Sequence, residues 1–128
     1  MKRLFHNLFL LVILFPAISF SDVVKPALVE ISVFSDGRYE VELRASIEAL
    51  LTGINGQYKN TQEAPSSDEY DRLRELQPEA LALAFAPFKS TLTELIGLEF
   101  DGQRVVPEIG TVNIPPRGYT KVPRISVI

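Results

Sequence analysis

The sequence predicts an α+β domain made of short antiparallel strands and a helical insertion. Two stretches of alternating apolar and polar residues each contain an Asp-Gly pair, which is typical of β-hairpins. Between them, apolar residues recur at spacings of three and four, which indicates helices. We therefore expect a small antiparallel β-sandwich or open sheet with a two-to-three-helix insertion, after a cleaved signal peptide.

The start of the chain has the features of a signal peptide. A basic start precedes residues 8–15 (LFLLVILF), an apolar run of h-region length, and cleavage after Ser19 or Ser21 fits the small residues there. An uncleaved membrane anchor is the alternative, but the run is shorter than the roughly 20 residues of a spanning helix. We expect residues 1–21 to be the signal peptide. Residues 22–128 would then form a single extracytoplasmic domain, periplasmic or extracellular, without a transmembrane helix.

Composition excludes several chemistries. The 128-residue chain has no cysteine, and cleavage also removes its only histidine, His6. The 107-residue mature chain keeps 11 of the 13 basic residues against 16 acidic ones, a net charge of −5. Without histidine or cysteine, a Ser-His-Asp triad, a thiol nucleophile and an ordinary zinc site cannot be built. The acidic balance argues against nucleic-acid binding, which needs clustered Lys and Arg.

The first hairpin is predicted over residues 27–34 and 39–43, with Asp36-Gly37 in the turn. The alternation is that of half-buried strands. In the first strand Val29, Ile31 and Val33 alternate with Glu30 and Ser32. In the return strand one face would carry Tyr39, Val41 and Leu43. The other face would carry Arg38, Glu40, Glu42 and Arg44.

A short helix should follow, capped by Ser46 and ended by Gly53, with an apolar stripe on one side. The stripe consists of Ile47, Leu50, Leu51 and Ile54. Residues 55–65 are polar and rich in turn formers, which predicts a loop.

A second helix should open at Ser66, which has capping-box spacing to Glu69. Its stripe is Tyr70, Leu73 and Leu76. A helix then restarts with Pro78 in its first turn and ends at Gly97. Pro87 should kink that helix or split it in two.

Strand character returns near the C-terminus. Residues 98–100 and 103–106 flank Asp101-Gly102, which predicts a second hairpin. Residues 110–114 and 122–128 are further strand candidates. The chain stops within strand pattern, so either the domain closes with few strands or the chain is a truncated form of something longer.

The order of several short stretches carries a family resemblance. They are residues 25–31 (KPALVEI), 36–41 (DGRYEV), 47–54 (IEALLTGI), 70–74 (YDRLR), 78–81 (PEAL), 85–87 (FAP), 114–116 (IPP) and 123–126 (PRIS). Together they resemble the N-terminal extracytoplasmic region of HupE/UreJ-type membrane proteins, over nearly all of the mature chain.

The resemblance implies membership of a membrane assembly linked by name to nickel handling. The family's transmembrane helices and their histidine-bearing motif are absent from this sequence, so transport does not carry over. Members often have a histidine near the position of Asp22 to Val24, and this chain has none, which weakens metal capture. A family chain would continue past residue 126, which agrees with the abrupt end.

Two groups of acidic residues are candidate sites. Asp68, Glu69, Asp71 and Glu75 could offer oxygens to a hard cation, but no glycine-punctuated loop surrounds them. We interpret them as a solvated helix start with an Asp71–Arg74 pair. Glu40 and Glu42 could be a hydrolase carboxylate pair, but the flanking arginines favour a charged outer sheet face.

Aromatic and apolar residues give the remaining candidates. Tyr58, Tyr70 and Tyr119 lie in or beside loops and could stack on a ligand, although such tyrosines more often cap a core. The long loop 55–67 is our favoured place for a partner contact. One group of apolar residues at helical spacing could form a face that lies on a membrane surface. Such a face needs basic residues beside it, and Lys89 is the only one here, so we prefer core packing for this group. Its members are Phe85, Phe88, Leu92 and Leu95.

We therefore expect an exported, non-enzymatic domain that binds a protein partner or belongs to a membrane-protein assembly, without transport activity of its own. The alternative is an independent secreted binding module for peptide, glycan or a hard cation. An enzyme using carboxylates without His or Cys stays open. No catalytic, cofactor-binding or metal-binding residue is assigned, and no cofactor is predicted.

Overall fold

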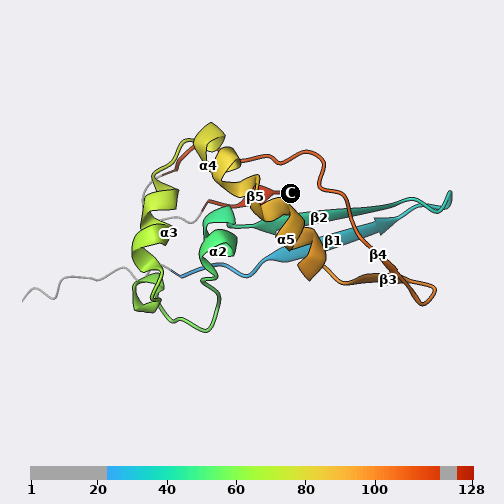
Figure 1. The fold of residues 1–128 in the computed structure, drawn as a ribbon, viewed down its shortest axis with the longest axis horizontal. Helices are drawn as coiled ribbons and strands as arrows, with labels where there is room; N and C mark the ends of the chain where they lie inside the picture. Colours follow the sequence, from blue (N-terminus) through green and yellow to red (C-terminus); the bar gives the residue numbers. More distant parts are fainter. Residues whose placement is uncertain (1–22, 119–123) are drawn as a thin grey trace, which may run out of the picture.

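The computed structural model describes residues 23–118 and 124–128. Within them the chain has an α+β fold with two small antiparallel sheets and four α-helices, which confirms the predicted fold class. The helices follow the first hairpin in sequence and precede the second (Figure 1). The expected signal peptide lies outside the described residues.

The larger sheet has three strands in the order β1-β2-β5. They are β1 (Leu28–Val33), β2 (Tyr39–Ala45) and β5 (Ser126–Val127). The register of β1 and β2 places Val29 opposite Leu43 and Ile31 opposite Val41. Both pairs lie on the predicted apolar face.

The turn between β1 and β2 forms at the predicted Asp-Gly pair. The Phe34 amide donates to the Arg38 carbonyl at 2.8 Å, and the Gly37 amide donates to the Phe34 carbonyl at 3.0 Å. Gly37 has φ of 85°, a left-handed conformation that glycine adopts without a steric penalty. The turn chemistry therefore fixes the register of the hairpin.

The helical layer begins with α2 (Ile47–Thr52). The Ser46 hydroxyl accepts from the Ala49 amide, and Gly53 ends the helix with φ of 70°, so both predicted end signals are confirmed. The remaining elements are the 3₁₀ helix η1 (Thr61–Glu63) and the helices α3 (Ser67–Arg74), α4 (Pro78–Phe85) and α5 (Phe88–Leu95).

Pro87 separates α4 from α5, so the splitting that its position predicted is confirmed. Proline has no amide hydrogen and therefore cannot continue the α4 ladder. The last bond of that ladder runs from the Ala86 amide to the Ala82 carbonyl. This division raises the number of helices to four.

The capping box predicted at Ser66 is wrong. The Ser66 side chain makes no cap bond to its own helix and instead donates to the Thr52 carbonyl at 3.0 Å, near the end of α2. Glu69 pairs with Arg72 one turn further along. The hydroxyl thus satisfies a carbonyl of a neighbouring helix, a partner that local spacing cannot reveal.

The second sheet is the hairpin of β3 (Leu98–Phe100) and β4 (Gln103–Val105), as predicted. The strand expected over residues 110–114 is reduced to an isolated bridge between Asn113 and Val127. The strand expected over residues 122–128 is only β5, and part of that range lies outside the described residues. Prolines at 115 and 116 lack the amide hydrogens that a longer ladder would use.

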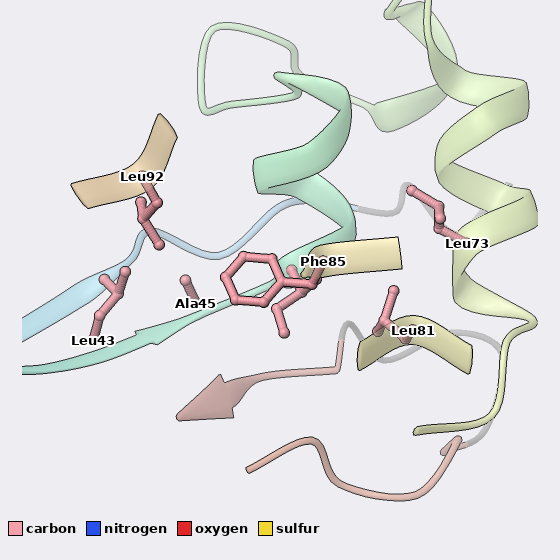
Figure 2. Close-up of a cluster of buried hydrophobic side chains, with 7 residues drawn as sticks. Leu43, Ala45, Leu73, Leu81, Phe85 and Leu92 are labelled. Atoms are coloured by element: carbon pink, nitrogen blue, oxygen red, sulfur yellow. The ribbon is translucent and has the colours of Figure 1, made fainter. Parts of the chain in front are cut away.

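The main core lies between β2 and the helices (Figure 2). Phe85 of α4 is fully buried, and its ring lies at the centre of the cluster, facing Ala45 of β2. The buried members of this cluster are Leu43, Ala45, Ile47, Leu73, Leu81, Phe85 and Leu92. A smaller cluster lies beneath the loop after α2 and contains Ala49, Ile54, Ala64 and Tyr70.

Candidate functional site

The β1–β2 hairpin reaches beyond the helical layer as a two-stranded arm (Figure 1). Along β1 every residue is exposed, with Val29 at 55%, Ile31 at 49% and Val33 at 67%. The half-buried character predicted for this face of β1 is therefore wrong. The side chains alternate as predicted, but no described element covers them.

The described side chains that pack on the apolar face of the hairpin contact β2. Phe100 of β3 packs on Tyr39 of β2, with ring centroids 4.9 Å apart. Leu92 of α5 belongs to the same core cluster as Leu43 of β2. The apolar face of the hairpin is thus covered along its second strand and open along its first.

Exposed apolar side chains concentrate in this part of the described chain. Most of the large hydrophobic residues with high exposure fall within residues 23–34. They are Val23, Leu28, Val29, Ile31, Val33 and Phe34, whereas Leu83, Leu95 and Val106 are the exposed ones elsewhere. Of these, Val29, Ile31 and Val33 alternate along one face of β1. Exposed apolar surface of this kind often marks an interaction site.

The outer edge of β1 also presents main-chain groups that no other described strand pairs with. Leu43 of β2 exchanges main-chain hydrogen bonds with Ile128, at 3.1 and 2.9 Å, so its amide and carbonyl point away from β1. In an antiparallel ladder the residue opposite has its own groups pointing to the other side. The amides and carbonyls of Val29, Ile31 and Val33 therefore line the free edge.

The opposite face of the hairpin is charged, as predicted. Arg44 Nε lies 2.5 Å from Glu42 Oε1, and Glu30 sits directly across from Glu42 in the register. Glu40 is exposed and lies opposite Ser32. This arrangement agrees with the favoured interpretation as a charged sheet surface and offers no cleft between two carboxylates.

At the tip of the arm, Arg38 lowers the pKa of the Asp36 carboxyl below its usual value. The larger cause is the Arg38 side chain, whose Nε donates to Oδ2 at 2.7 Å, and the Arg38 amide adds a bond to Oδ1 at 3.1 Å. A carboxylate with a lowered folded-state pKa stabilises the turn above the ordinary aspartate pKa. That contribution is lost as pH falls through the lowered value.

We expect the Asp36 carboxyl carbon to titrate by NMR with a midpoint below that of an aspartate in an unstructured peptide. Arg38→Gln should move the midpoint upward, because the side-chain donor is the main cause of the lowered pKa. Arg72→Gln, on the distant helix α3, should leave it unchanged. Equal midpoints in wild type and Arg38→Gln would contradict the assignment.

A buried ion pair joins three elements of the fold. Glu48 in the first turn of α2 is fully buried, and Arg124 just before β5 is 8% exposed. Arg124 Nε donates to Glu48 Oε1 at 2.8 Å, and its Nη2 lies 2.7 Å from the same oxygen. The Ser46 hydroxyl donates to the second carboxylate oxygen at 3.0 Å.

The remaining Arg124 donors reach the end of α3. Nη1 donates to the Leu76 carbonyl at 3.0 Å, and Nη2 donates to the Leu73 carbonyl at 3.4 Å. These are carbonyls at a helix C-terminus, which a cation stabilises. Since both side chains are buried and bonded to groups of the fold itself, we interpret the pair as structural rather than catalytic.

The sequence did not reveal this pair. Glu48 has the position of a dipole-favouring acid in a first helical turn, and Arg124 is 76 residues away. The only available signal was the helical stripe around Ile47, which places Glu48 close to the buried side. No spacing rule connects it to Arg124.

The acidic group around α3 is dispersed among separate partners. Glu69 pairs with Arg72, Asp71 Oδ2 accepts from Gln62 Nε2 at 3.0 Å, and Glu75 Oε2 lies 2.6 Å from Arg117 Nη1. The expected Asp71–Arg74 pair is therefore replaced by other partners. The Arg72 side chain lowers the pKa of Glu69. The favoured interpretation as a solvated helix surface agrees with these contacts.

Two of the tyrosine candidates are placed by the structure, and Tyr119 lies outside the described residues. Tyr70 is fully buried, so it belongs to the core and cannot stack on a ligand in solution. Tyr58 is partly buried and packs against the same small cluster.

The loop favoured for a partner contact, residues 55–67, is anchored to the fold. Asn60 Oδ1 accepts from the Gln62 amide at 2.9 Å and caps η1. Thr61 and Ala64 are buried. These contacts give the loop a structural role, and its role in partner binding stays a prediction.

The apolar residues around Pro87 mainly pack in the core, as preferred. Phe85 and Leu92 are buried and Phe88 is partly buried against them. Leu95 departs from the pattern, with 72% exposure at the end of α5. A membrane-facing stripe is therefore not assembled on this helix.

No group of three or more His, Cys, Asp or Glu side chains in residues 23–118 and 124–128 is arranged to hold a metal ion. In the same ranges, every helix is too short or too polar to cross a membrane.

Comparison of the chain with models of protein families, with curated proteins and with solved structures finds no match. The resemblance to the HupE/UreJ extracytoplasmic region therefore remains a prediction that depends on the stretches quoted above. The candidate site is defined by the geometry of the β1–β2 arm alone.

Proposed function

We propose that this chain is an exported, non-enzymatic domain that binds a protein partner through the β1–β2 arm and has no transport activity of its own. The observation that carries the proposal is an edge strand whose apolar side chains are exposed and whose outward main-chain groups pair with no described strand. Such an edge binds an extended chain by adding a strand to the sheet.

The chemistry of the edge favours a polypeptide over the other ligands considered. Main-chain amides and carbonyls pair with another backbone, and branched side chains at alternate positions pack against those of an added strand. A glycan or a hard cation would need convergent hydroxyl or carboxylate groups. The arm offers β-branched residues on one face, and on the other Glu42 is paired with Arg44. Membership of a membrane-protein assembly is one form that this binding could take.

The proposal can be tested by photo-crosslinking in cells that express the full chain. A benzophenone amino acid at Ile31 or Val33 should give a discrete adduct, because these side chains would lie against the bound strand. The same probe at Leu83, which is 76% exposed on α4, serves as a matched control for random collision.

The adduct should be recovered with mature chain from the exported fraction, beginning at Phe20 or Asp22 by N-terminal sequencing. An adduct of twice the chain mass identifies self-association, and one of another mass identifies a different partner. If Ile31 and Val33 react no more than Leu83, the arm is not a binding surface. An intact Met1 start would contradict export.

A further inference from the structure

We infer that the free edge of β1 pairs with the same edge of a second copy of this chain, antiparallel and related by a two-fold axis at Ile31. This inference rests on the proposed function and names the partner. Two three-stranded sheets would then join into one continuous sheet. The contact would be isologous, with the same residues contributed by each copy.

The geometry of β1 suits such a pairing. Val29, Ile31 and Val33 have outward amides and carbonyls, so an antiparallel neighbour can pair with each of them. Centred on Ile31, each Ile31 faces its equivalent, and Val29 faces Val33 of the second copy. Every such pair exchanges two main-chain hydrogen bonds and places β-branched side chains side by side.

Charge distinguishes this register from its neighbours. With the axis at Ile31, Glu30 lies opposite Ser32 of the second copy, and no two acids face each other. Moving the axis to Glu30 would place the two Glu30 carboxylates directly opposite, which is destabilising. Moving the axis to Ser32 would place Val29 opposite Ser35 of the second copy, which lies beyond the end of β1. The apolar pair between Val29 and Val33 would then be lost.

The edge carries few of the devices that keep sheets apart. Natural edges are protected by charged side chains, lysine above all, by proline, by bulges or by a covering loop. Glu30 is the one charged residue of β1. β1 contains no lysine or proline, and its pairing with β2 is continuous over six residues, without a bulge. Its apolar side chains have exposed fractions of 49% to 67%. At the other side of the same sheet, β5 is bridged by Asn113. The self-complementary strand is therefore the open one.

The oligomeric state of the purified mature chain tests the inference. Sedimentation or light scattering across the micromolar range should show a concentration-dependent monomer–dimer equilibrium. Ile31→Lys should weaken the dimer on the order of tenfold or more, because two ammonium groups would face each other at the axis. Leu83→Lys makes the same change at an exposed leucine of α4 and should leave the equilibrium unchanged.

Circular dichroism and melting show whether each variant is folded. Ile31 is 49% exposed, so lysine fits there without burying its charge in the monomer. If the Ile31→Lys variant unfolds, disulfide formation between introduced cysteines tests the same contact without that substitution.

Cysteine pairing tests the register, since the chain has no native cysteine. Glu30 and Ser32 of the second copy form a non-hydrogen-bonded pair with Cα atoms about 4.5 Å apart, within the range of a disulfide. An oxidised mixture of Glu30→Cys and Ser32→Cys proteins should favour the mixed disulfide over either homodimer. Leu83→Cys measures pairing by random collision.

A monomer at every concentration, with no cysteine pairing above the Leu83→Cys level, would overturn the inference. A Glu30→Cys or a Ser32→Cys homodimer in excess would overturn the register. If the purified chain is monomeric while the Ile31 photo-probe captures another protein in cells, the second-copy inference fails and the proposed function stands. If the photo-probe also gives no specific adduct, both fail.

Discussion

Replacing Arg124 by methionine should lower the free energy of unfolding by about 3–5 kcal/mol, the loss expected when one partner of a buried ion pair is removed. Glu48 is fully buried, and without Arg124 the Ser46 hydroxyl is its one remaining side-chain partner among the described residues. The Leu76 carbonyl also loses a donor. Urea denaturation of the mature chain measures the difference.

A double-mutant cycle separates the pair from its surroundings. Glu48→Met with Arg124→Met removes both charges and keeps apolar volume, so the double variant should be more stable than Arg124→Met alone. A double variant that loses as much as the two single variants together would show that the residues are not coupled.

Arg117→Met is the matched control. Arg117 also reaches the end of α3, where its Nη1 lies 2.6 Å from Glu75 Oε2, but both side chains are about half exposed. Exposed ion pairs contribute about 0.2–1 kcal/mol, so this variant should change stability by less than about 1 kcal/mol. The contrast between two arginines at one helix end isolates the effect of burial.

The features that the sequence predicted well depend on residues within a few positions of each other. The turn at Gly37, the cap at Ser46, the end at Gly53 and the break at Pro87 each follow from one residue's dihedral or hydrogen-bonding limits. These local rules are sufficient to place the hairpins and helices and to define an α+β fold.

The features that it predicted poorly depend on distant segments. Alternation correctly assigns Val29 and Ile31 to one face of β1, but burial depends on what packs there. Phe100 of β3 packs on Tyr39 of β2 instead. The Glu48–Arg124 pair and the Ser66–Thr52 bond likewise join residues that no periodicity relates.

The candidate site came from such a mismatch between pattern and packing. The local pattern of β1 is that of a strand with one apolar face, but that face is exposed along its length in the tertiary structure. The sequence could therefore predict the strand and its faces, but the exposure of β1, which no described element covers, depends on the tertiary packing.

The second large effect is expected at the centre of the core. Phe85→Ala should lower the free energy of unfolding by about 3–5 kcal/mol, because a fully buried aromatic ring is removed and a cavity remains. Leu83→Ala lies on the same helix at 76% exposure and should change stability by less than about 0.5 kcal/mol. Urea denaturation of both variants gives the comparison.

Phe85 should matter more than its aromatic neighbour because of where its ring packs. Its centroid lies 6.1 Å from that of Phe88, which is only partly buried at the start of α5. Phe85 instead faces Ala45 of β2 (Figure 2), so its loss would leave a cavity between the helices and the sheet. Phe88→Ala should therefore cost less than Phe85→Ala. The reverse order would mean that α5, rather than α4, holds the helical layer on β2.

Because single domains are stable by about 5–15 kcal/mol, Phe85→Ala would remove much of the free energy that keeps the β1–β2 arm folded and available for pairing.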